Sequence, residues 1–243
     1  MVKAIVLGAG KGTRLSSEET QVPKVLRRAN GKPLIEYVLQ ALDFIEKPDI
    51  TIVVGFLPEQ VKAQLGSEYA YVLQDSQLGT GHAVAVTEPS LANFQGHLLI
   101  CYGDMPLLSK KTLQEMVKHQ LDKEADCSLL VGDSKTPLPY GRIIRGSDGR
   151  FVEVIEEKDC NLLQKAITEL NMGVYVVRAP LVFDALKKLT SDNAASEFYL
   201  TDLPGILARD GYHVETHRLE NLIESQGVNT KADLALCEGL IRG

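Results

Sequence analysis

Short runs of aliphatic and β-branched residues alternate with amphipathic helical patterns along almost the whole chain. This alternation is typical of a mostly parallel sheet covered by helices. Residues 2–8 are nearly continuous in apolar side chains, as expected for a strand buried on both faces, and we predict that they form the first, central strand. The predicted fold class is therefore α/β.

The elements that follow can be placed from periodicity and from turn residues. Further strands are predicted at residues 50–56, 69–73, 97–102, 127–131, 171–177 and 213–217, with a hairpin formed by 141–145 and 151–156. Helices are predicted from residue 33, at 58–65, from 80 into 87–91, and at 109–121, 180–189, 198–209 and 231–241. Because no repeat, low-complexity tract or obvious linker divides the chain, we expect a single domain over residues 1–243.

Composition argues against several classes of protein. With 243 residues, 44% of them hydrophobic, the chain can bury a full core, and no window approaches the roughly 18 consecutive apolar residues of a membrane helix. The N-terminus lacks the cleavage site of a secretory signal, and the four cysteines show no paired metal-ligand spacing. We expect a cytoplasmic protein with reduced thiols. The net charge of −6 argues against binding to nucleic acid or to an anionic membrane.

Positive charge is concentrated near the N-terminus. Residues 1–35 carry seven basic and two acidic groups, a local charge of +5 that leaves −11 for the remainder. A positive cluster on an acidic protein indicates a small anionic ligand held at one place. A solvated face of Lys and Arg is the ordinary alternative.

A glycine-rich loop, Gly8-x-Gly10-x-Gly12, follows the first strand. Glycines let backbone N–H groups approach phosphate oxygens without interference from a Cβ atom. The spacing matches neither the P-loop pattern nor the dinucleotide fingerprint, and Val22-Pro23 interrupts the polar segment behind it, so a loop rather than a helix would surround the ligand. For the glycines alone a simple tight turn is an equal alternative. The nearby basic side chains, which could converge on one phosphate group, favour phosphate binding: Lys11, Arg14 and Lys24.

Three further positions combine a polar side chain with a favourable place in the pattern. Gln74 precedes residues 79–81 (Gly-Thr-Gly), and its amide offers the donor and the acceptor that suit a uracil edge; a solvated strand end and a helix N-cap would explain the same residues. Asp104 lies just beyond an apolar strand, where open α/β sheets place ligand sites and where a carboxylate can hold Mg²⁺. From spacing alone an Asx turn before Pro106 is favoured for Asp104. Asn229, taken by itself, fits an ordinary cap before the helix predicted from residue 231.

Seven short motifs, in the same order, are similar to those of the sugar-nucleotide pyrophosphorylases. The likeness is greatest to the N-acetylglucosamine-1-phosphate uridyltransferase domain of the bifunctional bacterial members. The first motif comprises the glycine loop, Arg14 and Pro23-Lys24. The others lie at residues 73–83, 102–106, 140–143, 156–159, 171–173 and 227–229. The resemblance covers essentially the whole chain.

The resemblance implies a fold, a division of labour and a reaction. The fold is that of the nucleotide-diphospho-sugar transferases: a Rossmann-like, mostly parallel sheet covered by helices, with a smaller mixed β half for the acceptor. A nucleotide-binding part at about 1–108 would precede a sugar-phosphate-binding part at about 109–229. The implied reaction joins UTP and N-acetylglucosamine 1-phosphate in a Mg²⁺-dependent nucleotidyl transfer. Its products are pyrophosphate and UDP-N-acetylglucosamine, a cell-envelope precursor.

The resemblance also implies a role for each matching residue. Arg14 and Lys24 would be catalytic, with Arg14 on the departing phosphates. Asp104 and Asn229 would hold Mg²⁺. The nucleotide would contact Leu7, Gly8, Ala9, Gly10, Gly12, Gln74, Gly79 and Thr80. The sugar would contact Tyr102, Gly141, Glu156 and Asn171.

The sequence also departs from the family. Three extra residues lie between Arg14 and Lys24, Gly8 replaces a more usual alanine, and Met172 stands where Thr or Ser is common. The β-helix repeats of the bifunctional members are absent from the chain, so we expect no acetyl transfer. The alternative functions are uridylyl or thymidylyl transfer to glucose 1-phosphate, guanylyl transfer to mannose 1-phosphate, a catalytically silent sugar-nucleotide sensor and, as the weakest, a dehydrogenase.

Overall fold

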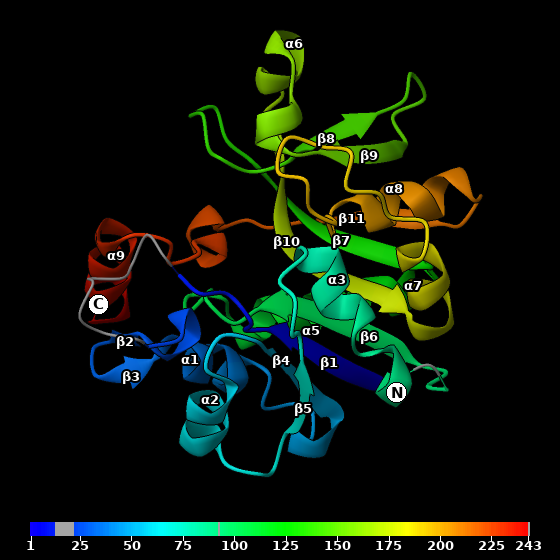
Figure 1. The fold of residues 1–243 in the computed structure, drawn as a ribbon. Coiled ribbons are helices and arrows are strands. Elements are labelled where there is room, and N and C mark those ends of the chain that lie inside the picture. The colour runs from blue at the N-terminus through cyan, green and yellow to red at the C-terminus, as the bar shows by residue number, and fades with distance from the viewer. Residues whose placement is uncertain (13–21, 92, 243) are drawn as a thin grey trace.

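The computed structural model describes residues 1–12, 22–91 and 93–242 (Figure 1). In this part of the chain nine strands form one sheet, in the order β11-β7-β10-β6-β1-β4-β5, with β8 paired to β10 and β9 paired to β8. The strands of this sheet are β1 (Val2–Leu7), β4 (Ile50–Val54), β5 (Ala70–Leu73), β6 (His97–Tyr102), β7 (Cys127–Asp133), β8 (Arg142–Arg145), β9 (Phe151–Ile155), β10 (Glu169–Arg178) and β11 (Val214–Arg218). The helices are α1 (Leu34–Ala41), α2 (Pro58–Leu65), α3 (Thr80–Ala85), α4 (Glu88–Leu91), α5 (Lys110–Asp122), α6 (Leu162–Lys165), α7 (Ala179–Leu186), α8 (Asp202–Arg209) and α9 (Lys231–Arg242).

Among the described strands, four of the six neighbouring pairs on the path from β11 to β5 run parallel. β1 pairs in parallel with β4 and β6, β4 with β5, and β11 with β7. β10 is antiparallel to both β6 and β7 and so joins the two parallel groups. β8 and β9 form an antiparallel hairpin against β10. The predicted fold, a mostly parallel sheet with a mixed second half, is confirmed.

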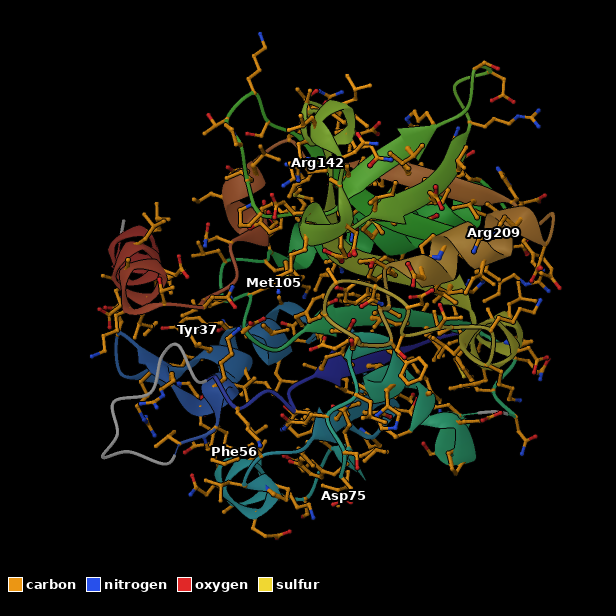
Figure 2. The ribbon with its side chains drawn as sticks, turned by 45° about the horizontal axis from the view of Figure 1, so that its top comes forward. Tyr37, Phe56, Asp75, Met105, Arg142 and Arg209 are labelled. Carbon is orange, nitrogen blue, oxygen red and sulfur yellow. The ribbon has the colours of Figure 1, made fainter. Side chains whose placement is uncertain are left out.

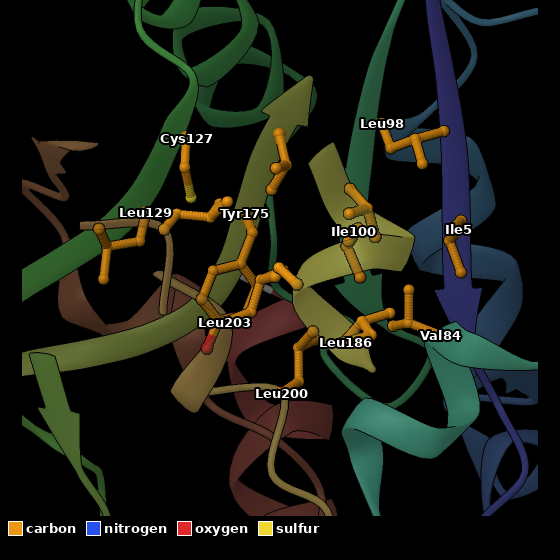
Figure 3. Close-up of a cluster of buried hydrophobic side chains, with 14 of the residues drawn as sticks. Ile5, Val84, Leu98, Ile100, Cys127, Leu129, Tyr175, Leu186, Leu200 and Leu203 are labelled. Carbon is orange, nitrogen blue, oxygen red and sulfur yellow. The ribbon is translucent and has the colours of Figure 1, made fainter. Parts of the chain in front are cut away.

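Apolar side chains cover both faces of the sheet. In β1, Ile5 and Leu7 belong to one buried cluster, and Ala4 and Val6 belong to the cluster on the other face. The first cluster includes side chains of α3, α7 and α8 (Figure 3), and the second includes side chains of α1 and α5. Burial on both faces explains why the strand is continuously apolar, and each large side chain contributes roughly 1.5–3 kcal/mol. Every helix in the described ranges is too short or too polar to cross a bilayer.

Two helices differ from the sequence prediction. The long helix predicted after residue 80 is divided into α3 and α4, where the Thr87 hydroxyl bonds back to a carbonyl one turn earlier (2.7 Å). α8 begins four residues later than predicted, at residue 202. Phe198 is instead bound to the segment around α3, since its N–H donates to the Leu78 carbonyl at 2.8 Å. Its carbonyl, which in a helix would accept the N–H four residues on, accepts the Gly81 N–H at 2.8 Å. The sequence pattern does not predict the two short strands β2 (Arg28–Ala29) and β3 (Lys32–Pro33), the short helix α6, or the brief 3-10 helices of the described residues.

The carboxyl ends of four parallel strands meet at one edge of the sheet. The register pairs Leu7 of β1 with Val53 of β4 and with Tyr102 of β6. The loops that follow β1, β4, β5 and β6 therefore emerge side by side. Open α/β sheets place their ligand sites at this edge.

Candidate active site

A cleft of about 470 Å³ opens at this edge of the sheet. Most residues to which the sequence assigns a site role line it: Leu7, Gly8, Ala9, Gly10, Lys24, Gln74, Gly79, Thr80, Tyr102, Asp104, Gly141, Glu156, Asn171 and Asn229. The cleft therefore extends from the loops after β1, β5 and β6 to the β8–β10 region. Gly12 is not part of the lining, and Arg14 lies outside the described residues.

The lining also contains side chains for which the sequence indicates no role. Gln77 and Tyr140 belong to two of the seven motifs, so their motif membership could have identified them. Met105, labelled in Figure 2, follows Asp104 in a third motif. Glu197 and Ser225 lie outside every motif, and no local sequence signal would have found them.

The glycine loop is held against the neighbouring strands through its backbone. The Gly8 N–H donates to the Val53 carbonyl at 2.9 Å. Gly12 has a φ of +66°, and a Cβ added there would lie 2.8 Å from the Lys24 Cβ. A side chain at position 12 would therefore be strained and would push Lys24 aside. The glycine is needed for the close approach of Lys24.

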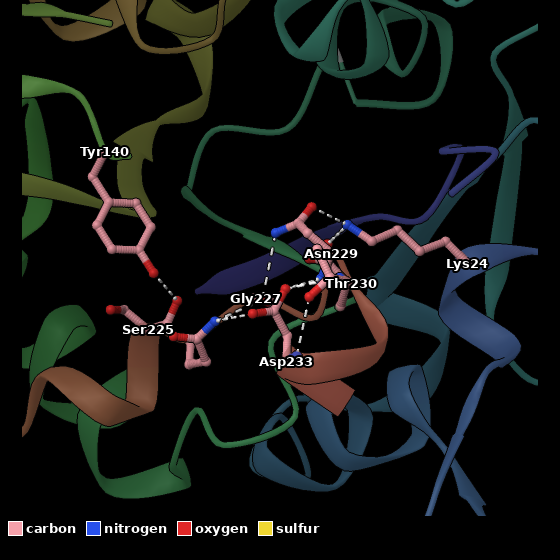
Figure 4. A network of polar contacts seen from close by, with 9 residues as sticks. Lys24, Tyr140, Ser225, Gly227, Asn229, Thr230 and Asp233 are labelled. Carbon is pink, nitrogen blue, oxygen red and sulfur yellow. Dashed lines mark hydrogen bonds and ion pairs between the residues drawn. The ribbon is translucent and has the colours of Figure 1, made fainter. Parts of the chain in front are cut away.

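Lys24, Asp104 and Asn229 converge in the cleft from three distant parts of the chain. The Lys24 ammonium forms an ion pair with the Asp104 carboxylate. It also donates to Asn229 Oδ1 at 2.8 Å (Figure 4). The Lys24 and Asp104 side chains are only 15% and 17% exposed, so solvent screens this ion pair less than a surface pair. The Val228 N–H donates to the Asp104 carbonyl at 2.9 Å and ties the Asn229 segment to the loop after β6.

Thr230, rather than Asn229, caps the last helix. The Asp233 carboxylate accepts the backbone N–H groups of Asn229 (2.9 Å) and Thr230 (2.8 Å). The Thr230 hydroxyl oxygen accepts the Asp233 N–H at 3.1 Å, which completes a reciprocal cap like a capping box (Figure 4). The cap leaves the Asn229 amide oxygen in position to meet Lys24.

Gln74 is buried, with 4% of its surface exposed, and is not a solvated strand end. Its Nε2 donates to the Gly79 carbonyl at 3.0 Å and lies 3.1 Å from His82 Nδ1. Gly79 has a φ of +116°, and a Cβ there would lie 2.5 Å from the Phe198 carbonyl oxygen. The Gly79 carbonyl, in the loop after β5, and the His82 side chain, on α3, thus both contact the Gln74 Nε2 and fix the orientation of its amide.

The other end of the cleft is built on β8–β10. The Asn171 N–H donates to the Gly141 carbonyl at 2.9 Å. The Asn171 Nδ2 donates to the hydroxyl of the fully buried Tyr175 at 2.7 Å, which fixes the orientation of the Asn171 amide. A Cβ at Gly141 would lie 2.7 Å from the Val154 side chain, so only glycine fits there.

Two carboxyl groups at this end have raised pKa values. Burial raises the pKa of Glu156 above its ordinary value. The pKa of Asp202 is raised to about 6, first by burial and then by the charge of Glu156. Burial also raises the pKa of the Tyr102 hydroxyl, with the Glu156 charge as the second cause. Burial is thus the first cause of all three raised pKa values, and of these residues Tyr102 and Glu156 line the cleft.

The Asp202 pKa predicts a pH-dependent contribution to stability. An ordinary Asp has a pKa of 3.8, so the folded protein binds this proton more tightly than the unfolded chain does. The resulting stabilisation is present below pH 3.8 and is lost as the pH rises through about 6. We expect Asp202→Asn to flatten the fall in the free energy of unfolding across that range, measured by urea denaturation at several pH values. The exposed Asp184→Asn should leave the profile unchanged; an unchanged profile in Asp202→Asn would contradict the assignment.

Comparison with known proteins places the chain in a family. Residues 4–203 match the family model described as the MobA-like NTP transferase domain. The chain belongs to this family. Most residues that line the cleft lie within the matched range of this NTP transferase domain. The segment around Asn229 lies beyond it.

Curated relatives of this NTP transferase domain are bifunctional GlmU proteins. Those of Streptococcus agalactiae, Limosilactobacillus reuteri and Geobacillus thermodenitrificans are 38%, 40% and 38% identical to it. The alignments cover 98%, 98% and 100% of this chain and 51%, 52% and 52% of the relatives. The chain thus spans about half the length of the curated relatives that it matches. These matches confirm the resemblance that the seven motifs indicate.

Two solved structures share the fold of this NTP transferase domain. One is a Bacillus anthracis protein named as a glucose-1-phosphate thymidylyltransferase, in complex with sucrose: its TM-score is 0.77 at 19% identity, covering 100% of this chain and 96% of that chain. The other is a UDP-glucose pyrophosphorylase complexed with UDP-glucose, with a TM-score of 0.78 at 16% identity and coverage of 100% and 99%. Identities this low establish the fold alone.

Proposed function

We propose that this NTP transferase domain joins UTP and N-acetylglucosamine 1-phosphate, giving UDP-N-acetylglucosamine and pyrophosphate. The observation that carries the proposal is the cluster of Lys24, Asp104 and Asn229, which brings one cation and two oxygen donors to a single point of the cleft. Fixed charges at such a point suit the transfer of a nucleotidyl group from a triphosphate, where the negative charge of the reacting and departing phosphates must be neutralised. The GlmU relatives, at 36–40% identity, support this choice of substrates.

In this proposal the cleft has a nucleotide part and an acceptor part. Gln74 would bind the base: its Nε2 is occupied by Gly79 and His82, so Oε1 is the atom that would accept the N–H of a uracil ring. The backbone of the glycine loop would approach the phosphates. The nucleotide would be held by residues 1–108. The sugar would lie mainly against the β8–β10 region, within residues 109–229, and would also contact Tyr102 at the end of β6. The residues proposed for the sugar are Tyr102, Gly141, Glu156 and Asn171.

The oxygen donors of the cluster fit a divalent cation. The Asp104 carboxylate and Asn229 Oδ1 already meet at one cation, the Lys24 ammonium, which stands where a metal ion would share the same donors. Mg²⁺ prefers such oxygen ligands and usually completes its shell with water and substrate phosphates. The described residues hold no group of three or more His, Cys, Asp or Glu that would form a cage of protein ligands alone. We infer that Asp104 and Asn229 would hold Mg²⁺, which would neutralise phosphate charge when bound.

The protein side chains would orient the two substrates and neutralise the negative charge of their phosphates. A sugar phosphate is ionised at neutral pH and needs no strong general base to act as a nucleophile, so positioning and charge neutralisation suffice. Lys24 would leave Asp104 for the phosphates at the reacting centre when the nucleotide enters. Arg14, outside the described residues, keeps its predicted role on the departing phosphates.

A substrate panel tests the proposal. Pyrophosphate release would be measured for UTP, dTTP and GTP, each with N-acetylglucosamine, glucose or mannose 1-phosphate. We expect UTP with N-acetylglucosamine 1-phosphate to give the highest kcat/KM. A higher kcat/KM for another pair would show that the nucleotide and sugar phosphate of that pair are the substrates instead. Tight nucleotide binding without pyrophosphate release from any pair would favour a sugar-nucleotide sensor.

A further inference from the structure

The Ala9 carbonyl in the glycine loop accepts hydrogen bonds from two neighbouring loops. The backbone N–H of Phe56, just after β4, donates at 3.2 Å (Phe56 is labelled in Figure 2). The side-chain Nε2 of Gln77, in the loop after β5, donates at 2.7 Å. Gly55 packs so closely that an added Cβ would lie 2.8 Å from the Ala9 Cβ. The direction of the Ala9 carbonyl is therefore set by both loops.

This carbonyl also fixes the direction of the next N–H group. A trans peptide holds its C=O and N–H in opposite directions, so the Gly10 N–H points away from Phe56 and Gln77. Gly10 is exposed, lines the cleft and has open space around the position of a Cβ. Across the ranges that the structure describes, no backbone acceptor engages this N–H. It is available to an anionic oxygen.

Steric repulsion alone would not prevent the Ala9–Gly10 peptide from flipping over. Gly10 does not have a positive φ, and a flip of the Ala9–Gly10 peptide would make its φ positive, a conformation that glycine accepts without strain. The flip would turn the N–H away and bring the Ala9 carbonyl oxygen round in its place. That oxygen would repel a phosphate. The two hydrogen bonds to the carbonyl are what opposes the flip.

We propose that Gln77 is a positioning residue for the nucleotide: its amide holds the Ala9–Gly10 peptide so that the Gly10 N–H donates to a phosphate oxygen. This inference rests on the proposed function, because it requires a nucleoside triphosphate in the cleft. Phe56 donates from its backbone, so of the two donors Gln77 is the one that a change of side chain can remove without altering the backbone. Gln77 is exposed, and its replacement leaves the core intact.

The test compares the binding of UTP with that of uridine, which has the base and the ribose but no phosphate. Two variants remove the donor: Gln77→Ala, and Gln77→Met, which keeps the length of the side chain. We expect each to weaken UTP binding about 3- to 10-fold, the value of one hydrogen bond, and to leave uridine binding unchanged. The matched control is Gln64→Ala, which removes an exposed amide on α2 whose Nε2 donates to Glu36 at 2.8 Å. It should change neither affinity.

Each other outcome is informative. Equal losses for UTP and uridine would show that Gln77 acts on the base or on the whole cleft, and unchanged UTP binding would show that it does not act; either result overturns the inference. Failure of the unaltered protein to bind UTP more tightly than uridine would instead count against the proposed function.

A double-mutant cycle tests the peptide flip itself. Alanine at position 10 has room for its Cβ but resists a positive φ, so it opposes the flip without Gln77. Gln77→Ala should therefore weaken UTP binding less in the Gly10→Ala background than in the unaltered protein. An equal loss in both backgrounds would overturn the proposed locking of the peptide.

Discussion

Replacement of Lys24 by alanine is expected to lower kcat for pyrophosphate release by about 100- to 1,000-fold. The Lys24 ammonium is the cation that contacts both Asp104 and Asn229 in the cleft. The variant would lack the fixed positive charge that neutralises the α-phosphate during transfer of the uridylyl group. The loss should destabilise the transition state more than the bound substrates. Steady-state kinetics with UTP and N-acetylglucosamine 1-phosphate would measure the change, and circular dichroism would verify the fold.

The affinity of the Lys24→Ala variant for a metal ion shows whether the loss of turnover comes from the missing charge or from a damaged cleft. In the nucleotide-free protein the ammonium occupies the oxygen donors that a metal ion would use, so its removal should strengthen the binding of Mn²⁺, measured by electron paramagnetic resonance. The control Lys110→Ala removes an exposed lysine paired with Asp43 and should change neither kcat nor Mn²⁺ binding. Near-normal turnover in Lys24→Ala would remove Lys24 from the mechanism.

Asp104→Asn is expected to lower kcat by about 100-fold or more and to weaken Mn²⁺ binding in the same variant. Asparagine keeps the size and an oxygen that can accept from Lys24, but it removes the negative charge that a divalent cation requires. The shape of the cleft should therefore persist while its affinity for metal falls. Kinetics at rising Mg²⁺ concentrations would show an increased metal requirement.

The matched control is Asp122→Asn, an exposed carboxylate on α5 paired with Lys118, which should leave turnover and metal binding unchanged. An Asp104→Asn variant with reduced turnover but unaltered Mn²⁺ binding would assign Asp104 to the orientation of Lys24 alone. A variant unaltered in both would contradict its place in the site.

The fold was largely predictable because the central strands β1, β4, β6 and β7 are buried on both faces for most of their length. Such a strand produces a continuous apolar run, as in residues 2–8, which differs from the alternation of a half-exposed strand. The direction of β10 could not be predicted in the same way, since local pattern does not record whether a strand runs parallel or antiparallel to its neighbours. The late start of α8 depends on contacts of Phe198 with a loop more than a hundred residues earlier.

The site was less predictable from pattern than the fold. Lys24 is 80 residues from Asp104 and 205 residues from Asn229, and only the family resemblance joined them. From spacing alone, Asp104 suits an Asx turn and Asn229 a helix cap, but the structure gives the cap to Thr230. The burial of Gln74 likewise depends on a loop that folds over it.

The central claim is that this cleft transfers a nucleotidyl group between two phosphates. The most direct measurement is ³¹P nuclear magnetic resonance of the protein with UTP, N-acetylglucosamine 1-phosphate and Mg²⁺. We expect equal amounts of UDP-N-acetylglucosamine and pyrophosphate, with neither formed when the sugar phosphate is omitted. Unchanged substrates, or UDP and inorganic phosphate in their place, would contradict this claim.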